Sequence, residues 1–259
     1  MDIPVTLAQN LPARLAGLEC WPLRRTFNVA IFQFPGVLLC IFCFQFLAVK
    51  CFHLPAGINF GLAYKSTQYF KDLEIDGKYA DGSAAPTTVF NMNYPPIITA
   101  GLAYTNENFD VAVDYRFINY QKTAGFEKSG WVIGENGFPT GAVAGFGWKD
   151  VNVVKIGAAW RMNDRWTLRA GYNHGSNPIS PADVTFNILA PGVVQDHYTL
   201  GFTAAAGKDS EITGALMVAP RRSVTGASLF NGVLGAGAAG NETISMRETS
   251  FGLAWSRRF

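Results

Sequence analysis

Residues 154–173 read VKIGAAWRMNDRWTLRAGYN, and this stretch decides the fold. Large apolar side chains alternate with small or polar ones from Val154 to Arg161, and the alternation resumes from Trp166 to Asn173. Such alternation predicts β-strands, because successive side chains of a strand point to opposite faces of a sheet. The four residues from Met162 to Arg165 fit a tight polar turn between the two strands.

The same period of two recurs along most of the chain. Phe109, Val111, Val113 and Tyr115, for example, alternate with small or charged residues. The apolar spacing of three and four residues that marks a helix is absent after residue 57. We therefore predict an all-β, antiparallel protein of about eight strands, near residues 58–76, 96–105, 108–120, 150–162, 165–175, 196–206, 210–220 and 243–259.

The connections between these strands alternate in length. Tight turns are expected at 105–108, 162–165 and 207–210, and long connections near 77–95, 121–149, 176–195 and 221–242. Short periplasmic turns and long external loops are typical of a transmembrane β-barrel in the cell outer membrane of a Gram-negative bacterium. The alternative, a soluble β-sandwich, mixes loop lengths without such regularity.

Aromatic residues support the barrel, because they lie near the ends of the apolar faces: Tyr64, Tyr104, Phe109, Trp160, Trp166, Tyr198 and Trp255. Such rings form girdles at the two surfaces of a membrane. The opposite faces carry Gly, Ala, Thr and Asn with a few charges, which suits a lumen. The chain also ends on Phe259 after an alternating strand, an ending typical of outer-membrane barrels.

The composition of the 259 residues excludes other classes. Only 15% of the residues are charged, against roughly 25% in ordinary soluble domains. A formal net charge of +2 with no basic cluster argues against nucleic-acid binding. Aromatic residues make up 14% of the chain, which argues against disorder.

The N-terminal segment differs from the rest of the chain. Residues 26–49 carry no charge and are long enough for one helical membrane span of about 20 residues. We divide the chain into an apolar extension, 1–51, and a barrel segment, 52–259. The extension is interpreted as a leader, an anchor or a spurious upstream sequence, and it could be helical. Its four cysteines read as buried or membrane-embedded thiols rather than as a metal site: Cys20, Cys40, Cys43 and Cys51.

From Ile58 onward the sequence resembles a known family. The resemblance rests on four stretches, which follow one another in order: INFGLAYKS at 58–66, WTLRAGY at 166–172 with SNPI at 176–179, DHYTLGF at 196–202, and SFGLAW at 250–255. Together they are similar to the C-terminal half of the outer-membrane transporters for long-chain fatty acids and aromatic hydrocarbons, the FadL/TodX type.

The resemblance implies uptake of hydrophobic compounds through a 14-stranded barrel with an N-terminal hatch. This chain has room for about eight strands, and no hatch-like segment precedes Ile58. We therefore expect a truncated or fragmentary member, whose strands either close alone or form an open curled sheet. The alternative function is a structural or adhesive outer-membrane barrel that transports nothing.

The predicted long loops are rich in apolar residues, which suits a landing surface for a hydrophobic ligand. Our candidate ligand-binding residues there are Trp131, Ile133, Phe138, Phe146, Phe186 and Leu189. A third apolar loop covers 229–240. The alternative is that these loops pack on each other and cap the barrel.

Two basic residues on adjacent predicted strands, Lys155 and Arg169, are candidates to hold a carboxylate headgroup in the lumen. The alternative is a structural ladder of opposite charges across the lumen, to which Asp114 and Arg116 would belong. Other expected partners are outer-membrane lipid and the barrel-assembly machinery.

Catalysis is not expected. The three histidines are His53, His174, which falls on the lipid-facing register, and His197. No spacing of serine and histidine supports a hydrolase, and no phosphate-binding glycine loop or histidine-rich cluster is present. We expect no cofactor and no metal.

Overall fold

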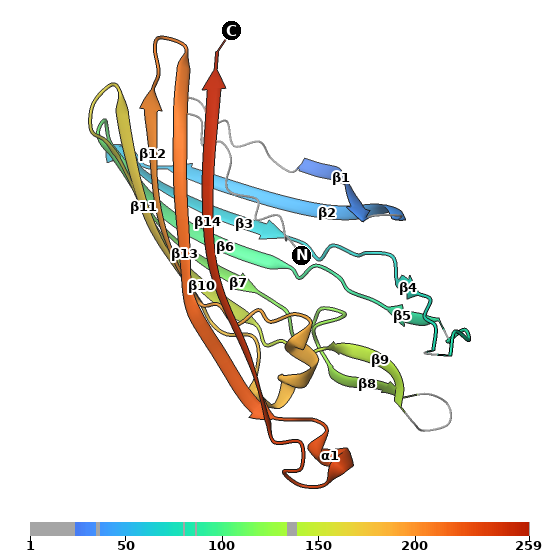
Figure 1. Ribbon diagram of the computed structural model, residues 1–259. Helices are drawn as coiled ribbons and strands as arrows, with labels where there is room; N and C mark the ends of the chain where they lie inside the picture. The colour runs from blue at the N-terminus through green and yellow to red at the C-terminus, as the bar shows by residue number, and fades with distance from the viewer. Residues whose placement is uncertain (1–23, 35–36, 80, 86, 134–138, 259) are drawn as a thin grey trace.

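Figure 1 shows the computed structural model, which describes residues 24–34, 37–79, 81–85, 87–133 and 139–258. Ten antiparallel strands form one sheet, and each strand pairs with its neighbours in chain order apart from short hairpins inserted in the loops. The strands are β1 (Arg24–Phe34), β2 (Val37–His53), β3 (Ile58–Lys65), β6 (Ile97–Thr105), β7 (Phe109–Ile118), β10 (Val151–Arg161), β11 (Trp166–Gly175), β12 (Asp196–Ala205), β13 (Ser210–Ala227) and β14 (Asn241–Arg257).

The long connections carry the remaining elements. Two small hairpins, β4 (Leu73–Ile75) with β5 (Thr88–Phe90) and β8 (Ser129–Ile133) with β9 (Pro139–Phe146), lie within loops. Short helical turns are η1 (Pro55–Gly57), η2 (Pro181–Asp183), η3 (Thr185–Ile188) and α1 (Asn231–Leu234). Tight turns join β6 to β7, β10 to β11 and β12 to β13, and Figure 1 shows them at the end of the sheet opposite α1 and β8–β9.

All eight predicted strands are present, so the prediction of an all-β antiparallel protein is confirmed. Two boundaries differ. The strand that begins at Ile58 ends at Lys65, because Gln68 starts a separate bridge to Tyr94. β13 continues seven residues past 220 to Ala227, where it still pairs with β14.

The N-terminal segment forms strands, and the expected helix there is wrong. β1 pairs with β2, and β2 pairs with β3 through partners such as Phe52 and Phe60. β2 therefore crosses the predicted division at residue 51 and joins the barrel sheet, with Cys40, Cys43 and Cys51 inside it. Among the described residues, no helix is long and apolar enough to span a membrane.

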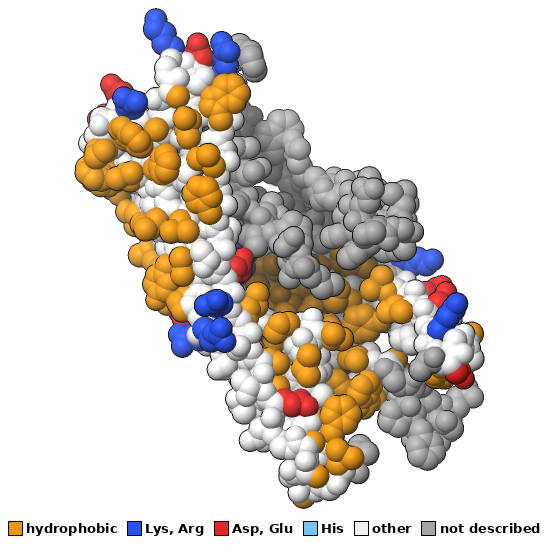
Figure 2. All heavy atoms as spheres, in the orientation of Figure 1, with side chains coloured by type: hydrophobic (Ala, Val, Ile, Leu, Met, Phe, Trp, Pro, Cys, Tyr) orange, Lys and Arg blue, Asp and Glu red, His pale blue; other side chains and the backbone are white. Residues whose placement is uncertain are grey.

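The two faces of the sheet differ in chemistry. The face that carries Leu200 and Phe251, here called the outward face, exposes large apolar side chains; these two are 62% and 72% exposed. Figure 2 shows such side chains as a band over the C-terminal strands of the sheet. The inward face carries small residues and most of the strand charges. This separation confirms the predicted alternation.

Aromatic side chains bound the outward face at both ends. Toward the long loops they are Tyr64, Tyr115, Tyr172 and Tyr198, and toward the tight turns Tyr104, Phe109, Trp160, Trp166 and Trp255. Neighbouring strands align these rings: Tyr172 is the register partner of Tyr198, with ring centres 5.1 Å apart, and Phe109 stacks on Trp160 at 6.0 Å. The outward face is thus an apolar band between two aromatic rows.

A small apolar core lies among the loops. Ile179, Val184 and Val193, all from the β11–β12 connection, bury their side chains against Ile244 of β14. The contact requires Gly226 in β13, because a Cβ there would lie 1.7 Å from the carbonyl oxygen of Pro181. The extension of β13 and β14 beyond the other strands is therefore the platform on which this loop folds.

Candidate functional site

The candidate site is built on two long connections that Asn187 locks together. Its side chain is fully buried, and its Oδ1 accepts a 2.6 Å hydrogen bond from Nε1 of Trp148. Its Nδ2 donates to the carbonyl oxygens of Phe146 and Asp183, each at 2.8 Å. One amide thus ties β9 and the residues after it to the loop between β11 and β12.

An aromatic cluster surrounds this lock. The rings of Tyr120 and Phe126 lie 4.9 and 5.0 Å from that of Trp148, and Phe146 contacts Phe126 at 6.0 Å. Burial raises the pKa of Tyr120 to about 12, and the charge of nearby Tyr94 adds to the effect. The cluster is therefore a packed apolar layer at the loop end of the sheet.

The β8–β9 hairpin joins the same assembly through Trp131 of β8. Its ring meets that of Phe186 in η3 edge to face at 5.6 Å, and Phe186 is only 7% exposed. Next to Phe186, Thr185 donates a hydrogen bond to Glu242 of β14, and its hydroxyl accepts the backbone N–H of Leu229 at 3.0 Å. Contacts therefore run from β8 through η3 to the loop that contains α1.

Apolar side chains remain exposed along this line of contacts. Ile133 at the hairpin tip, Leu189 after η3 and Leu234 in α1 are 59%, 81% and 66% exposed. We call the exposed set the apolar rim; it comprises Val132, Ile133, Ile188, Leu189, Leu229, Phe230 and Leu234. Figure 2 shows apolar side chains on the surface in the region of α1. Three loops that are distant in sequence and joined by these contacts thus each expose apolar side chains.

The six loop residues predicted to bind ligand fall into two groups. Ile133 and Leu189 belong to the apolar rim. The rings of Trp131, Phe146 and Phe186 instead pack against other loop residues. Phe138 lies outside the described residues. The loops therefore pack on each other, as the alternative interpretation proposed, and still leave an apolar surface.

The two basic residues predicted to hold a carboxylate are not neighbours. Lys155 is the register partner of Asn173, and Arg169 is the partner of Ala159. Four residues along β11 separate the two positions, about 13 Å at 3.3 Å per residue. Both side chains belong to the inward face, and the shared carboxylate site stays a prediction.

The charged residues of the inward face have partners close by. Lys155 lies opposite Asp114 in the β7–β10 register, and Arg161 forms an ion pair with Asp110. Arg169 donates to the hydroxyl of Thr203 at 2.7 Å, and Nε of Arg116 to the hydroxyl of Thr99 at 3.3 Å. Opposite charges thus alternate across β7 and β10, while Arg169 contacts a neutral group.

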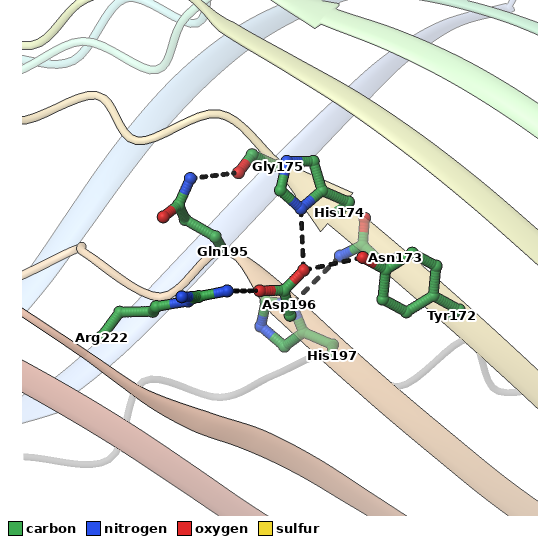
Figure 3. Close-up of polar contacts among 8 residues, drawn as sticks. All are labelled: Tyr172, Asn173, His174, Gly175, Gln195, Asp196, His197 and Arg222. Atoms are coloured by element: carbon green, nitrogen blue, oxygen red, sulfur yellow. Dashed lines mark hydrogen bonds and ion pairs between the residues drawn. The ribbon is translucent and has the colours of Figure 1, made fainter.

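A polar cluster that sequence reasoning missed lies on the outward face at the loop end of β11–β13 (Figure 3). Asp196 is buried and accepts hydrogen bonds from the hydroxyl of Tyr172 at 2.7 Å and from the side chain of Arg222, and its carboxylate lies 2.8 Å from Nδ1 of His174. His174 does face outward, as its register predicted, since its partner on β10 is the exposed Val154. The signal in the sequence was an acidic residue on the apolar register of a strand.

The chain was compared with known proteins. No protein-family model and no curated protein matches the sequence. The toluene transporter TodX of Pseudomonas putida matches 90% of this chain and 53% of its own, with a TM-score of 0.56 and 19% identity. A FadL homologue of Pseudomonas aeruginosa matches 86% and 56% (TM-score 0.53, 13% identity), and the monoaromatic hydrocarbon channel CymD 86% and 53% (0.51, 15%).

The chain has the FadL/TodX fold. It spans about half the length of these solved structures. The expected fold resemblance is thereby confirmed over the described strands.

Proposed function

We propose that this chain forms part of an outer-membrane barrel wall that takes up hydrophobic compounds. The observation that carries the proposal is the outward apolar band between two aromatic rows. β7, β11 and β12 are each ten residues long, and a tilted transmembrane strand needs about 9–11 residues. In water such a band would be an aggregation surface, whereas in a bilayer it meets acyl chains.

The wall is incomplete as one sheet. β1 and β14 lie at its two ends and do not pair with each other. An unpaired edge cannot remain in hydrocarbon, because its N–H and C=O groups would have no partners. We propose that further strands complete the wall, which is consistent with the greater length of the solved structures with this fold.

The apolar rim is evidence that the transported compound is hydrophobic. Exposed apolar side chains from three loops meet where a compound arriving from outside would first touch the barrel. Burying one such side chain contributes about 1.5–3 kcal/mol, roughly tenfold or more in affinity. The fold neighbours with described cargoes, a toluene transporter and a monoaromatic hydrocarbon channel, are of the same class.

The cargo is either a neutral hydrocarbon or a fatty acid, and the inward basic residues distinguish them. Arg169 is the stronger candidate for a carboxylate, because its contact is a neutral hydroxyl, whereas Lys155 lies opposite Asp114. We propose that Arg169 and Lys155 contact a carboxylate at two separate places on the inward face. Arg169→Gln should then weaken binding of a fatty acid and leave that of toluene unchanged.

A binding and uptake measurement tests the proposal. The triple substitution Ile133→Ser, Leu189→Ser and Leu234→Ser removes apolar surface from the rim. Ile75→Ser with Val89→Ser is the control, since these apolar side chains are each 53% exposed and lie on the separate β4–β5 hairpin. Cells with equal surface amounts should take up labelled toluene or fatty acid at least tenfold more slowly with the rim variant only.

Equal uptake by the rim variant and the wild type would contradict the landing surface. Absence of uptake by the wild type would favour the structural or adhesive barrel.

A further inference from the structure

Three arginines gather on the extended β13–β14 hairpin. The register pairs Ala219 with Glu248 and then Arg222 with Met246, so a bulge places Pro220 and Arg221 opposite Arg247. Arg221, Arg222 and Arg247 are all exposed. Figure 2 shows a group of basic side chains directly beyond the apolar band. We call these three residues the rim arginines.

The outward residues of β14 show where the rim arginines lie along the strand. Thr249, Phe251, Leu253 and Trp255 follow one another at every second position, flanked by Arg247 at one end and Arg257 at the other. The two arginines are ten residues apart, which is the length of strand that crosses the hydrocarbon of a membrane. Arg247 and its neighbours therefore stand at the level of the lipid headgroups on the long-loop side.

The structure holds two of these side chains in place. Arg222 donates to the carboxylate of Asp196, which Tyr172 and His174 also bond. Arg221 donates from Nη1 to the hydroxyl of Ser245 at 3.3 Å. A guanidinium has five N–H donors, so both retain donors for a second acceptor.

The local charge is positive. Asp196 balances Arg222, and Glu248 is half-buried on the opposite face of β14 by alternation. Arg221 and Arg247 thus add two positive charges to the outward surface. An anion is the complementary ligand, and a phosphate suits the bidentate geometry of arginine.

A groove lies on the band below the rim arginines. It has a volume of about 360 Å³. The large apolar residues of its lining are Leu168, Leu200, Phe202, Leu216 and Phe251, and Arg169, Gly201, Gly214 and Ala215 complete the lining. Leu216 and Phe251 are register partners, three positions from the pair Ala219 and Glu248 that precedes the bulge. The lining residue Phe251 is four residues along β14 from Arg247, about 13 Å. An apolar groove and a basic patch at that spacing on one face match a molecule with acyl chains and a phosphorylated head.

We propose that the rim arginines bind the phosphate of a lipid headgroup in the external leaflet, with an acyl chain in the groove below. This inference rests on the proposed outer-membrane location. It assigns to the outer wall of the barrel a lipid site that is separate from the inward face and from the apolar rim.

Binding of diphosphorylated lipid A to the full chain, folded in uncharged detergent, tests the site. Arg221→Gln with Arg247→Gln should weaken binding about tenfold or more, since each basic residue near a membrane surface contributes roughly fivefold. Arg222 is left intact because its loss would strand buried Asp196. Arg257→Gln with Arg258→Gln removes the same charge at the other end of β14 and should change binding less than twofold.

Three results would overturn the proposal: unchanged binding by the Arg221/Arg247 variant, equal weakening by the Arg257/Arg258 control, or equal binding of dephosphorylated lipid A. Displacement of the lipid by an equal concentration of inorganic phosphate would assign the arginines to a free anion and also overturn it.

Flotation with vesicles of uncharged phosphatidylcholine separates this site from the proposed function. Wild type and both variants should float with the vesicles and show heat-modifiable migration on gels. Failure of the wild type to insert would contradict the membrane location, whereas insertion without selective lipid A binding would contradict only the headgroup site.

Discussion

Trp148 donates a 2.6 Å hydrogen bond from its indole to Oδ1 of Asn187, and this contact joins two loops that are 39 residues apart in the chain. Asn187 has no exposed surface, so its amide is satisfied entirely by protein groups. The apolar rim depends on this contact because Ile188 and Leu189, two of its members, directly follow Asn187 in the chain. The loop end of the barrel is thus ordered by buried polar bonds rather than by apolar packing alone.

Asn187→Ala should release this lock. The substitution leaves the Trp148 indole and the carbonyl of Phe146 without their partner, and a lost buried partner costs about 1–3 kcal/mol. We expect faster proteolysis of the 176–195 connection in the folded barrel and a shift in Trp fluorescence. Asn241→Ala, at an exposed position, is the control, and equal proteolysis rates for the two variants would contradict the role of Asn187.

Gly226→Ala should separate the loop core from β13. The added Cβ would meet the carbonyl oxygen of Pro181 at 1.7 Å, and neither group is a flexible side chain. Overpacking of this kind destabilises by about 1–3 kcal/mol or more. Gly232→Ala, which meets no atom within 4 Å, is the control.

The expected result is a lower melting temperature of the loop core for Gly226→Ala and no change for Gly232→Ala. A Gly226→Ala variant with wild-type stability would show that β13 and η2 are not packed as described.

Alkaline pH should loosen the aromatic cluster. The pKa of Tyr120 is about 12 in the folded protein and about 10 in an unfolded chain, so folding favours the neutral phenol. This contribution is complete below pH 10 and is lost as the pH rises toward 12. Trp148 fluorescence, which reports on the contact with Tyr120, should therefore change between pH 10 and 12.

Tyr120→Phe removes the titrating group and should remove most of that change. Persistence of the full fluorescence change in Tyr120→Phe would assign the transition to another group.

The strands could be predicted because the two faces of each strand differ in chemistry. β7, β10, β11 and β12 alternate strictly, since one face carries large apolar side chains and the other small or polar ones, and their bounds agree with prediction within about two residues. β1 and β2 were missed for the opposite reason. Residues 26–49 are apolar without a period, and an apolar run of that kind does not distinguish a strand from a helix.

The site was harder to predict because it depends on register and on loop packing. The length of the 162–165 turn sets Lys155 opposite Asn173 rather than Arg169, so two basic residues on adjacent strands were not a pair. The bulge between Ala219 and Arg222, which brings the rim arginines together, leaves no mark in the alternation. Apolar composition did identify the three loops of the apolar rim, although it did not separate packed residues such as Phe186 from exposed ones such as Leu189.

The central claim is that the outward face meets lipid, and spin labels along β12 test it most directly. Single cysteines at 198–203, in a background with the four native cysteines replaced by serine, would each carry a nitroxide in vesicles. We expect labels at 198, 200 and 202 to collide mainly with oxygen dissolved in the bilayer, and labels at 199, 201 and 203 mainly with a water-soluble nickel reagent. Uniform accessibility along β12, or the opposite alternation, would contradict the barrel wall.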